Sequence, residues 1–317
     1  MTDEFSTLED LARELSGRRE AFVRALVVRA QHPTSARAGD RALVSDTGEI
    51  NGFVGGNCVQ ASVREYSLRA LADGEPVLLR VSPGEPSREQ QDGAVDVSNP
   101  CLSGGAIEIF LEPQLPAPRV VVVGSTPVAL TVLRLGAGLG FELAHTDGDA
   151  VPTQAGDAAL IVASHGTAEE PALEAALHAG IPYVGLVASG KRAAAVLASL
   201  DVTDAERFRV HSPAGLPIGA RTPAEIALSI LAELVAERSG SPALEPGAAG
   251  ESSAGSAPIE PPRREAPATA TDPVCGMSVA AVPATLHADH DGVRTYFCAA
   301  GCRTAFLADP ERYAVPS

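Results

Sequence analysis

Three cysteines near the end of the chain have the spacing of a metal-binding site. Cys275 stands in the run DPVCGM at 272–277, and Cys298 and Cys302 follow it in the pattern C-x22-C-x3-C. Thiolates grouped in this way hold soft or borderline metals, so zinc, copper(I) or iron would each suit them. Because Cys298 and Cys302 are four residues apart, we expect them to share one face of a helix. Cys275, in a glycine-containing turn, would close the site from the other side.

The fourth ligand of such a site is left open by the sequence. His287 or His290 would supply it, and solvated loop histidines explain both residues equally well. A module this small cannot bury a large hydrophobic core and needs an additional stabilising crosslink. This requirement favours metal binding. The alternative is a small cysteine-containing fold that binds no metal.

Two glycine–cysteine elements stand in the first third of the chain. One follows a predicted strand and opens a predicted helix, and the other precedes a predicted strand; their members are Gly55, Gly56, Cys58, Cys101, Gly104 and Gly105. A cysteine at a helix N-terminus gains thiolate character and metal affinity, and glycines let a large flat ligand approach the backbone. If the fold brings both elements together, they form one thiol-lined pocket. The equal alternative is that both cysteines are small buried core residues.

The hydrophobic pattern predicts the elements that position these residues. Leu8, Leu11 and Leu15 fall on one face of a helix, and a second helix begins near Cys58. Short runs rich in β-branched residues, bounded by turn residues, predict strands. These strands are expected at 22–29, 42–45, 49–54, 77–81 and 106–111.

From Arg119 onward, strands and helices alternate along the chain. The predicted strands are 119–124, 158–164 and 183–187, and the predicted helices are 128–139, 169–179, 191–200 and 224–238. We expect Thr222 to cap the last helix and Pro223 to occupy its first position. Alternation of this kind predicts an α/β fold with a parallel sheet of Rossmann type.

The loop after the first of these strands is a candidate phosphate site. It reads GSTPVA at 124–129, so Gly124 matches the first glycine of G-x-G-x-x-G and Thr126 replaces the second. This favours a Rossmann fold without a nicotinamide cofactor. Lys191 and Arg192, at a predicted helix N-terminus, are further phosphate-binding candidates, with a solvated helix face as the alternative.

A change of composition separates the parts of the chain. Residues 239–270 are rich in Pro, Gly, Ser and Ala, which predicts a disordered linker. We therefore predict an N-terminal α/β domain at 1–118, a Rossmann-like domain at 119–238, this linker, and a small cysteine-rich module at 271–317.

Charge and composition exclude several classes of function. The net charge of −16 argues against nucleic acid and anionic lipid as partners, since both demand clustered Lys and Arg. No apolar run has the length of a transmembrane helix, and the acidic N-terminus is unlike a signal peptide. Five cysteines, an odd number, indicate reduced thiols. We expect a cytoplasmic protein.

Residues 20–238 resemble the XdhC/CoxI family. The resemblance is carried by GDRALV at 39–44, GFVGGNCV at 52–59, Cys101 with GGAIEIFLEP at 104–113, YVGL at 183–186 before Lys191 and Arg192, and HSPAGLPIGARTPAEIA at 211–227. Members of this family are maturation factors of molybdenum hydroxylases such as xanthine dehydrogenase and carbon monoxide dehydrogenase. They bind molybdenum cofactor (molybdopterin), support its sulfuration by a cysteine desulfurase and deliver it to the apoenzyme.

The resemblance thus implies an accessory chaperone rather than an enzyme, with self-association into a homo-oligomer. Its cofactor-binding residues would be the two cysteines and four glycines above, with Gly124, Lys191 and Arg192 in the Rossmann half. One alternative is an NAD(P)-dependent oxidoreductase. Another is a metal trafficking or sensing protein that acts through its tail.

The tail at 272–313 resembles a YHS domain, and its cysteine spacing also fits the related TRASH pattern. The residues that carry this resemblance are DPVCGM, the FC-x3-C element and DPERY at 309–313. It implies that Cys275, Cys298 and Cys302 bind a metal.

Overall fold

Two segments that are far apart in the sequence form the first unit of the computed structural model. They are Met1–Pro116 and Arg263–Ser317, and Ala117–Pro262 forms the second unit. The structure describes residues 2–84, 91–98, 105–147, 152–154, 156–238 and 265–313. Most of the predicted linker at 239–270 lies outside these residues.

A six-stranded sheet in the order β3-β2-β1-β6-β4-β5 forms the centre of the first unit. Neighbouring strands are antiparallel, except that β4 and β5 are parallel. The strands are β1 Phe22–Gln31, β2 Arg41–Ser45, β3 Ile50–Gly52, β4 Val77–Ser82, β5 Ala94–Ser98 and β6 Ala106–Gln114. The sequence predicts all of these strands except β5, whose residues are only half-buried.

Two helices cover opposite faces of this sheet. Side chains alternate along β2, so Ala42 and Val44 pack under α2 (Asn57–Asp73), whereas Leu43 packs under α1 (Thr2–Gly17). Leu15 of α1 contributes to the smaller of these two cores. The predicted helical face of α1 is thereby confirmed.

The tail module consists of two short hairpins and two helices. β12 (Thr269–Thr271) pairs with β13 (Ser278–Ala280), and β14 (Leu286–His290) pairs with β15 (Val293–Phe297). The helices α8 (Ala300–Ala308) and α9 (Pro310–Tyr313) follow. Phe297 and Phe306 pack together in the small core of this module, with ring centroids 5.2 Å apart.

The tail module packs on helix α2 of the first sheet. Met277 and Val279 contact Ala61 of α2, and Ala280 and Val282 join the main hydrophobic core beneath the helix. The hydroxyl of Ser278 donates to Glu65 at 3.1 Å. The two segments of the first unit therefore share one core.

The second unit contains a five-stranded parallel sheet in the order β11-β10-β9-β7-β8. Its strands are β7 Arg119–Val123, β8 Glu142–Thr146, β9 Ala159–Val162, β10 Tyr183–Leu186 and β11 Val210–His211. The central strands β7, β9 and β10 are buried on both faces, as their continuous apolar runs predict. This confirms the Rossmann-like fold.

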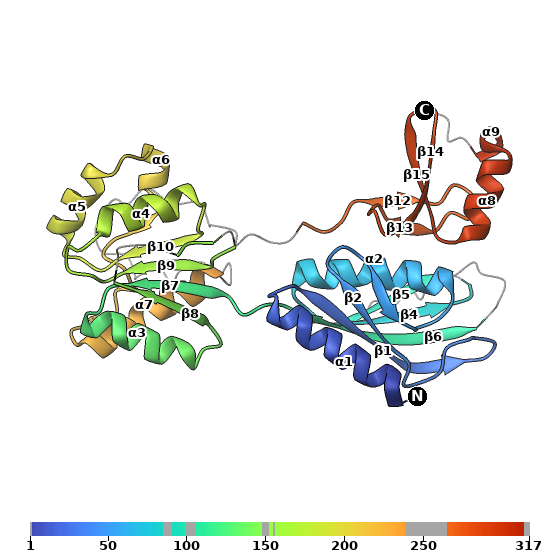
Figure 1. Cartoon of the computed structure of the whole chain (residues 1–317), viewed down its shortest axis with the longest axis horizontal. Coiled ribbons are helices and arrows are strands. Elements are labelled where there is room, and N and C mark those ends of the chain that lie inside the picture. Colours follow the sequence, from blue (N-terminus) through green and yellow to red (C-terminus); the bar gives the residue numbers. More distant parts are fainter. Residues whose placement is uncertain are drawn as a thin grey trace. The chain divides into compact units, whose positions relative to one another are not determined.

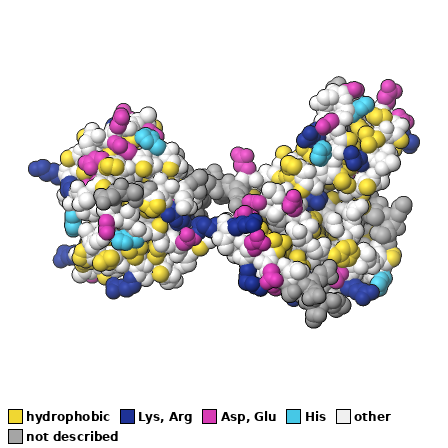
Figure 2. Space-filling model, viewed as in Figure 1, with side chains coloured by type: hydrophobic (Ala, Val, Ile, Leu, Met, Phe, Trp, Pro, Cys, Tyr) yellow, Lys and Arg dark blue, Asp and Glu magenta, His cyan; other side chains and the backbone are white. Residues whose placement is uncertain are grey.

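Helices cover both faces of the parallel sheet (Figure 1). The helices α3 (Pro127–Ala137) and α7 (Pro223–Arg238) lie on one face, and α4 (Glu169–His178) and α5 (Gly190–Ser199) lie on the other. Thr222 accepts the Glu225 N–H at 3.3 Å, as expected of the residue that caps α7. On the face that Figure 2 presents, basic side chains are scattered among acidic ones within each unit.

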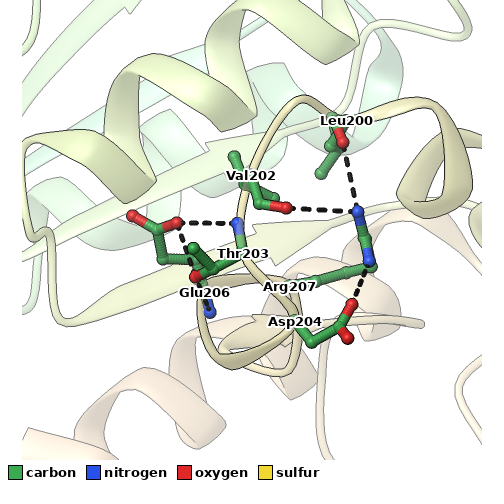
Figure 3. Close-up of polar contacts among 6 residues, drawn as sticks. All are labelled: Leu200, Val202, Thr203, Asp204, Glu206 and Arg207. Atoms are coloured by element: carbon green, nitrogen blue, oxygen red, sulfur yellow. Dashed lines mark hydrogen bonds and ion pairs between the residues drawn. The ribbon is translucent and has the colours of Figure 1, made fainter.

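A capping box defines the short helix α6 (Asp204–Arg207) before β11 (Figure 3). Thr203 accepts the backbone N–H of Glu206, and the Glu206 carboxylate accepts the backbone N–H of Thr203 at 2.9 Å. Arg207 donates to the carbonyl groups of Leu200 and Val202, which fixes the loop before the helix. These local bonds cap α6 and connect it to the loop that follows α5.

Candidate functional site

The three cysteines of the tail converge on one point. The sulfur atoms of Cys275 and Cys298 are 3.5 Å apart, and those of Cys298 and Cys302 are 3.8 Å apart. A carboxylate oxygen of Asp272 completes the group, and all four potential ligand atoms lie within 4.8 Å of one another. The cysteines are free thiols. The arrangement can hold a thiophilic metal ion.

Asp272 and the ends of the secondary structure elements fix these positions. Cys275 lies in the turn between β12 and β13, where Gly276 adopts a φ of +78°. The fully buried Asp272 accepts the backbone N–H groups of Val274 at 2.9 Å and Cys298 at 2.8 Å. One carboxylate thus joins the cysteine-bearing turn to the end of β15.

The prediction that Cys298 and Cys302 share one face of a helix is wrong. Helix α8 begins at Ala300, and its capping residue Ala299 is extended, with φ −148° and ψ 158°. Cys298 therefore precedes the helix, and Cys302 lies in its first turn. Their thiols meet because the chain bends sharply between strand and helix.

The surroundings of the thiols favour their protonated form. A hydrogen bond to Cys58, and then burial, raise the pKa of Cys298 far above its usual range. Burial, and then the negative charge of Asp272, raise the pKa of Cys302 to about 12. Without a cation, these sulfurs keep their protons; a bound cation would supply the positive charge that thiolates require.

The two tail histidines stand apart from this cluster. The Nδ1 atom of His287 lies 2.8 Å from the Thr285 carbonyl oxygen, and the His290 ring packs edge-on against Phe306. Among the described residues, the side chain that joins the three thiols is Asp272 instead. Its position three residues before Cys275 in the DPVCGM run is the sequence signal for this role.

A cleft of about 590 Å³ lies at the N-terminus of α2. It is lined by Gly56 and Cys58 of the first glycine–cysteine element, by Gly105 of the second, by the loop His32–Ser35 and by Ala299 of the tail. The structure thus brings the two elements together as far as it describes them. Cys101 and Gly104 lie outside the described residues.

Glycine is required at two positions around this cleft. A Cβ atom on Gly105 would lie 2.1 Å from the carbonyl oxygen of Pro33, so no side chain fits there. Gly55 has a φ of +135° and sits against Val59. At Gly56, by contrast, a Cβ atom would meet nothing within 4 Å. This glycine caps α2 without a side-chain hydrogen bond.

Cys58 lines the cleft and packs next to the thiol cluster. It lies in the first turn of α2, and its side chain packs beside the buried Cys298 of the tail. It also packs in the cluster formed by Ala61, Met277 and Val279. Sequence reasoning treated the two sites separately because no local pattern connects them.

The phosphate-loop candidate in the second unit is closed by its own side chains. Gly124 has a φ of +103°, and a Cβ atom there would lie 2.6 Å from the Ala163 carbonyl oxygen. The Thr126 hydroxyl accepts the Ala129 N–H at 3.2 Å and donates to Ala163 at 2.7 Å. The threonine that replaces the second glycine therefore caps α3 itself.

Lys191 and Arg192 lie in the first turn of α5 in the same unit, and they differ in environment. Arg192 forms an ion pair of 2.5 Å with Glu169, whose side chain is only 1% exposed and also accepts the Gly166 N–H at 2.8 Å. Lys191 is exposed. Arg192 is thus held by a buried carboxylate.

A second polar network, not found by sequence reasoning, involves Glu233 of α7. Its carboxylate accepts the Tyr183 hydroxyl at 2.6 Å and the Gly215 N–H at 2.8 Å, and it lies 3.4 Å from His211. Burial opposes ionisation, but the bonds from His211, Tyr183 and Gly215 outweigh it and lower the pKa of Glu233. The network joins β10, β11 and α7 through the HSPAG segment.

The architecture is that of an α/β protein with a mixed-sheet domain, a Rossmann domain and a cysteine-bearing tail. Three family models match these parts. Residues 15–82 match the XdhC and CoxI family, residues 120–234 match the XdhC Rossmann domain, and residues 270–317 match the YHS domain. The chain thus carries both domains of the XdhC and CoxI family, followed by a YHS domain.

Two curated proteins are similar to this chain. An uncharacterized protein, YqeB of Escherichia coli (strain K12), is 28% identical over 236 residues, which are 66% of this chain and 42% of that protein. A probable subunit of the xanthine dehydrogenase of Bacillus subtilis (strain 168) is 26% identical over 155 residues, 41% of this chain and 46% of that protein. The chain therefore spans less than half the length of either relative.

Among solved structures, a crystal structure of a xanthine dehydrogenase from Bacillus halodurans is 15% identical. It covers 72% of this chain and 94% of that chain, with a TM-score of 0.35. Among the described residues there is no helix with the length and apolarity needed to cross a membrane.

Proposed function

We propose that this protein binds molybdenum cofactor in the cleft at Cys58 and assists the maturation of a molybdenum hydroxylase. The observation that carries this proposal is the convergence of Gly56, Cys58 and Gly105 on one cleft of about 590 Å³. The family match and the similarity to a probable subunit of xanthine dehydrogenase support it.

The residues of the cleft suit the chemistry of this cofactor. The Cys58 sulfur is a soft ligand that can approach molybdenum. The N-terminus of α2 has no side-chain cap at Gly56, so its backbone N–H groups can bind the pterin phosphate. Gly56 and Gly105 leave the backbone open to a flat ring. When bound, the cofactor supplies the molybdenum centre that the client enzyme uses.

We further propose the partners that this role requires. They are the apoenzyme of a hydroxylase of the xanthine dehydrogenase or carbon monoxide dehydrogenase kind, a cysteine desulfurase that provides sulfur for the cofactor, and a second copy of this chain. We assign Cys101 and Gly104 to the same cofactor site. We also propose that the protein works in the cytoplasm, where its five cysteines would stay reduced.

The test is the molybdenum and oxidised-pterin content of the full chain purified from a molybdenum-replete host. We expect stoichiometric pterin in the wild type and at least a ~10-fold loss in Cys58→Ser and Cys101→Ser. Cys302→Ser is the matched control, because it removes a thiol that does not line the cleft, and should retain pterin. Pterin retained in both Cys58→Ser and Cys101→Ser would reject the thiol assignment.

A second candidate function, metal trafficking or sensing, is favoured by the three-thiol cluster of the tail. In that case the purified chain would carry a transition metal without pterin, and Cys275→Ser would remove it. An NAD(P)-dependent oxidoreductase has less support, because the Thr126 side chain already caps the helix at which a pyrophosphate would bind. Titration with NAD(P) tests it directly.

A further inference from the structure

The two candidate sites of the first unit meet at one residue, Cys58. Cys58 lines the cleft, and its side chain also packs in one cluster with Cys275, Cys298 and Cys302 of the tail. Ala299, the next residue of the tail, lines the same cleft. The two sites are therefore adjacent at Cys58.

The packing of the tail places its three thiols next to Cys58 of α2. β13 lies against α2, where Ser278 donates to Glu65, and Glu65 is paired with Arg69 at 2.5 Å. Ala280 and Val282 are part of the core below the helix. Because both thiol-bearing segments are anchored by buried contacts, Cys58 and Cys298 stay near each other without any bound ion.

The sulfur separations fit a tetrahedral thiolate site. A zinc–sulfur bond of about 2.3 Å implies that neighbouring sulfurs lie about 3.8 Å apart. The observed separations are 3.5 Å between Cys275 and Cys298 and 3.8 Å between Cys298 and Cys302. Three sulfurs account for three corners of such a tetrahedron, so a fourth ligand is needed to close it.

Asp272 is the less suitable occupant of the fourth corner. Its two oxygens each accept a backbone N–H, one from Val274 and one from Cys298, and these bonds build the turn that presents the thiols. Cys58 approaches Cys298 from the opposite segment. Cys58 and Cys302 both lie in the first turns of helices, α2 and α8, whose positive ends would stabilise bound thiolates.

We propose that Cys58 is the fourth sulfur ligand of a Zn²⁺-type site whose other ligands are Cys275, Cys298 and Cys302. As each sulfur binds the cation, its thiol proton passes to solvent. The site joins the tail to α2, and its occupancy masks the thiol that faces the cleft. The consequence for cofactor binding rests on the proposed function, whereas the metal site does not.

The first test is a cobalt and zinc titration of the reduced, metal-stripped full chain. In Cys58→Ser we expect the thiolate-to-cobalt charge-transfer absorbance to fall by about one quarter, one sulfur in four. We expect zinc affinity to fall by about 10-fold or more. Asn57→Ala, which changes the adjacent cleft residue and keeps the thiol, should match the wild type. Equal absorbance and affinity in Cys58→Ser would overturn the proposal.

The second test leaves Cys58 intact, so it does not depend on the folding of a Cys58 variant. Iodoacetamide labelling of Cys58, followed by peptide mass spectrometry, should slow by about 10-fold when zinc is added. In Cys275→Ser and Cys302→Ser, zinc should give little of this protection. A labelling rate that zinc does not change, or equal protection in those variants, would contradict the assignment.

Neither test uses molybdenum cofactor. If the chain carries no pterin from a replete host, the proposed function fails while the cobalt spectrum still reports on Cys58. If the cobalt spectrum is the same with and without the Cys58 thiol, the metal assignment fails while pterin content remains a separate result.

Discussion

The carboxylate of Asp272 accepts the backbone N–H of Cys298 at 2.8 Å, and this bond connects the two halves of the tail module. Its other oxygen accepts the Val274 N–H, next to Cys275. Because Asp272 is completely buried, water cannot replace either bond when the carboxylate is removed.

We therefore expect Asp272→Ala to destabilise the tail module by about 2–4 kcal/mol, since the buried N–H of Cys298 and the part-buried N–H of Val274 lose their acceptor. Asp272→Asn, which keeps the shape and one acceptor oxygen, should cost less. Denaturant unfolding monitored through the tail tyrosines, together with zinc affinity, measures both effects. Unchanged zinc affinity in Asp272→Ala would show that this carboxylate does not position the thiols.

Two glycines of the cleft should respond differently to the same substitution. Gly105→Ala places a methyl group 2.1 Å from the Pro33 carbonyl oxygen, so strand β6 or the loop must move. We expect a loss of stability of about 1–3 kcal/mol and of most bound pterin. Gly56→Ala meets open space and should cost less than about 1 kcal/mol. Thermal unfolding of both variants provides the comparison, with pterin content measured for Gly105→Ala, and equal stability of the two variants would contradict it.

The neighbouring residues Lys191 and Arg192 offer a second matched pair. Arg192→Ala leaves the buried Glu169 carboxylate without its partner, and we expect a loss of about 2–3 kcal/mol, reduced from the fully buried case because Arg192 is 34% exposed. Lys191→Ala should change stability by less than about 0.5 kcal/mol. Urea unfolding of the two variants measures this. If Arg192→Ala is as stable as the wild type, the arginine is free for a ligand.

Glu233 should make the stability of the Rossmann domain depend on pH. Its pKa lies below the ordinary value of 4.5, because the bonds from His211, Tyr183 and Gly215 outweigh its burial. A depressed carboxylate pKa stabilises the fold fully above the unfolded pKa and loses this effect as the pH falls through the folded pKa. Stability contributed by Glu233 should therefore begin to decline near the unfolded value of about pH 4.5 and be lost once the pH has fallen below the folded pKa.

Glu233→Gln should remove that part of the pH dependence and lower stability near neutral pH by about 2 kcal/mol. Tyr183→Phe is the control, because it deletes one hydrogen bond and leaves the titrating group. Unfolding curves between pH 3 and 7 measure the difference. Parallel pH profiles for Glu233→Gln and the wild type would rule out this role.

The sequence predicts the elements with continuous apolar runs and misses those at edges. β7, β9 and β10 are found because buried parallel strands read as apolar segments. The sequence does not predict β8 (Glu142–Thr146) because it is an edge strand with exposed positions. It does not predict β5 because each residue of that strand is half-buried. Edge strands carry a weaker pattern, since neighbours cover only part of their surface.

The sequence predicts the individual residues of the candidate site but not how the fold brings them together. Residue type and spacing identify Cys275, Cys298 and Cys302, and the glycine–cysteine motif identifies Cys58. The packing of Cys58 beside the tail thiols depends on the contact of β13 with α2, which no local periodicity encodes. The helical-face prediction fails for a local reason, namely the extended conformation of Ala299.

Ala280 and Val282 supply apolar surface to a core whose other members come from the first 111 residues of the chain. A fragment that ends before the tail would therefore fold with a cavity in its hydrophobic core, where Ala280 and Val282 are missing. We expect such a fragment to recover its stability when the separate tail peptide is added, as split proteins do when their halves reassociate. The Rossmann domain, inserted between the two halves, would then be tethered at one end only.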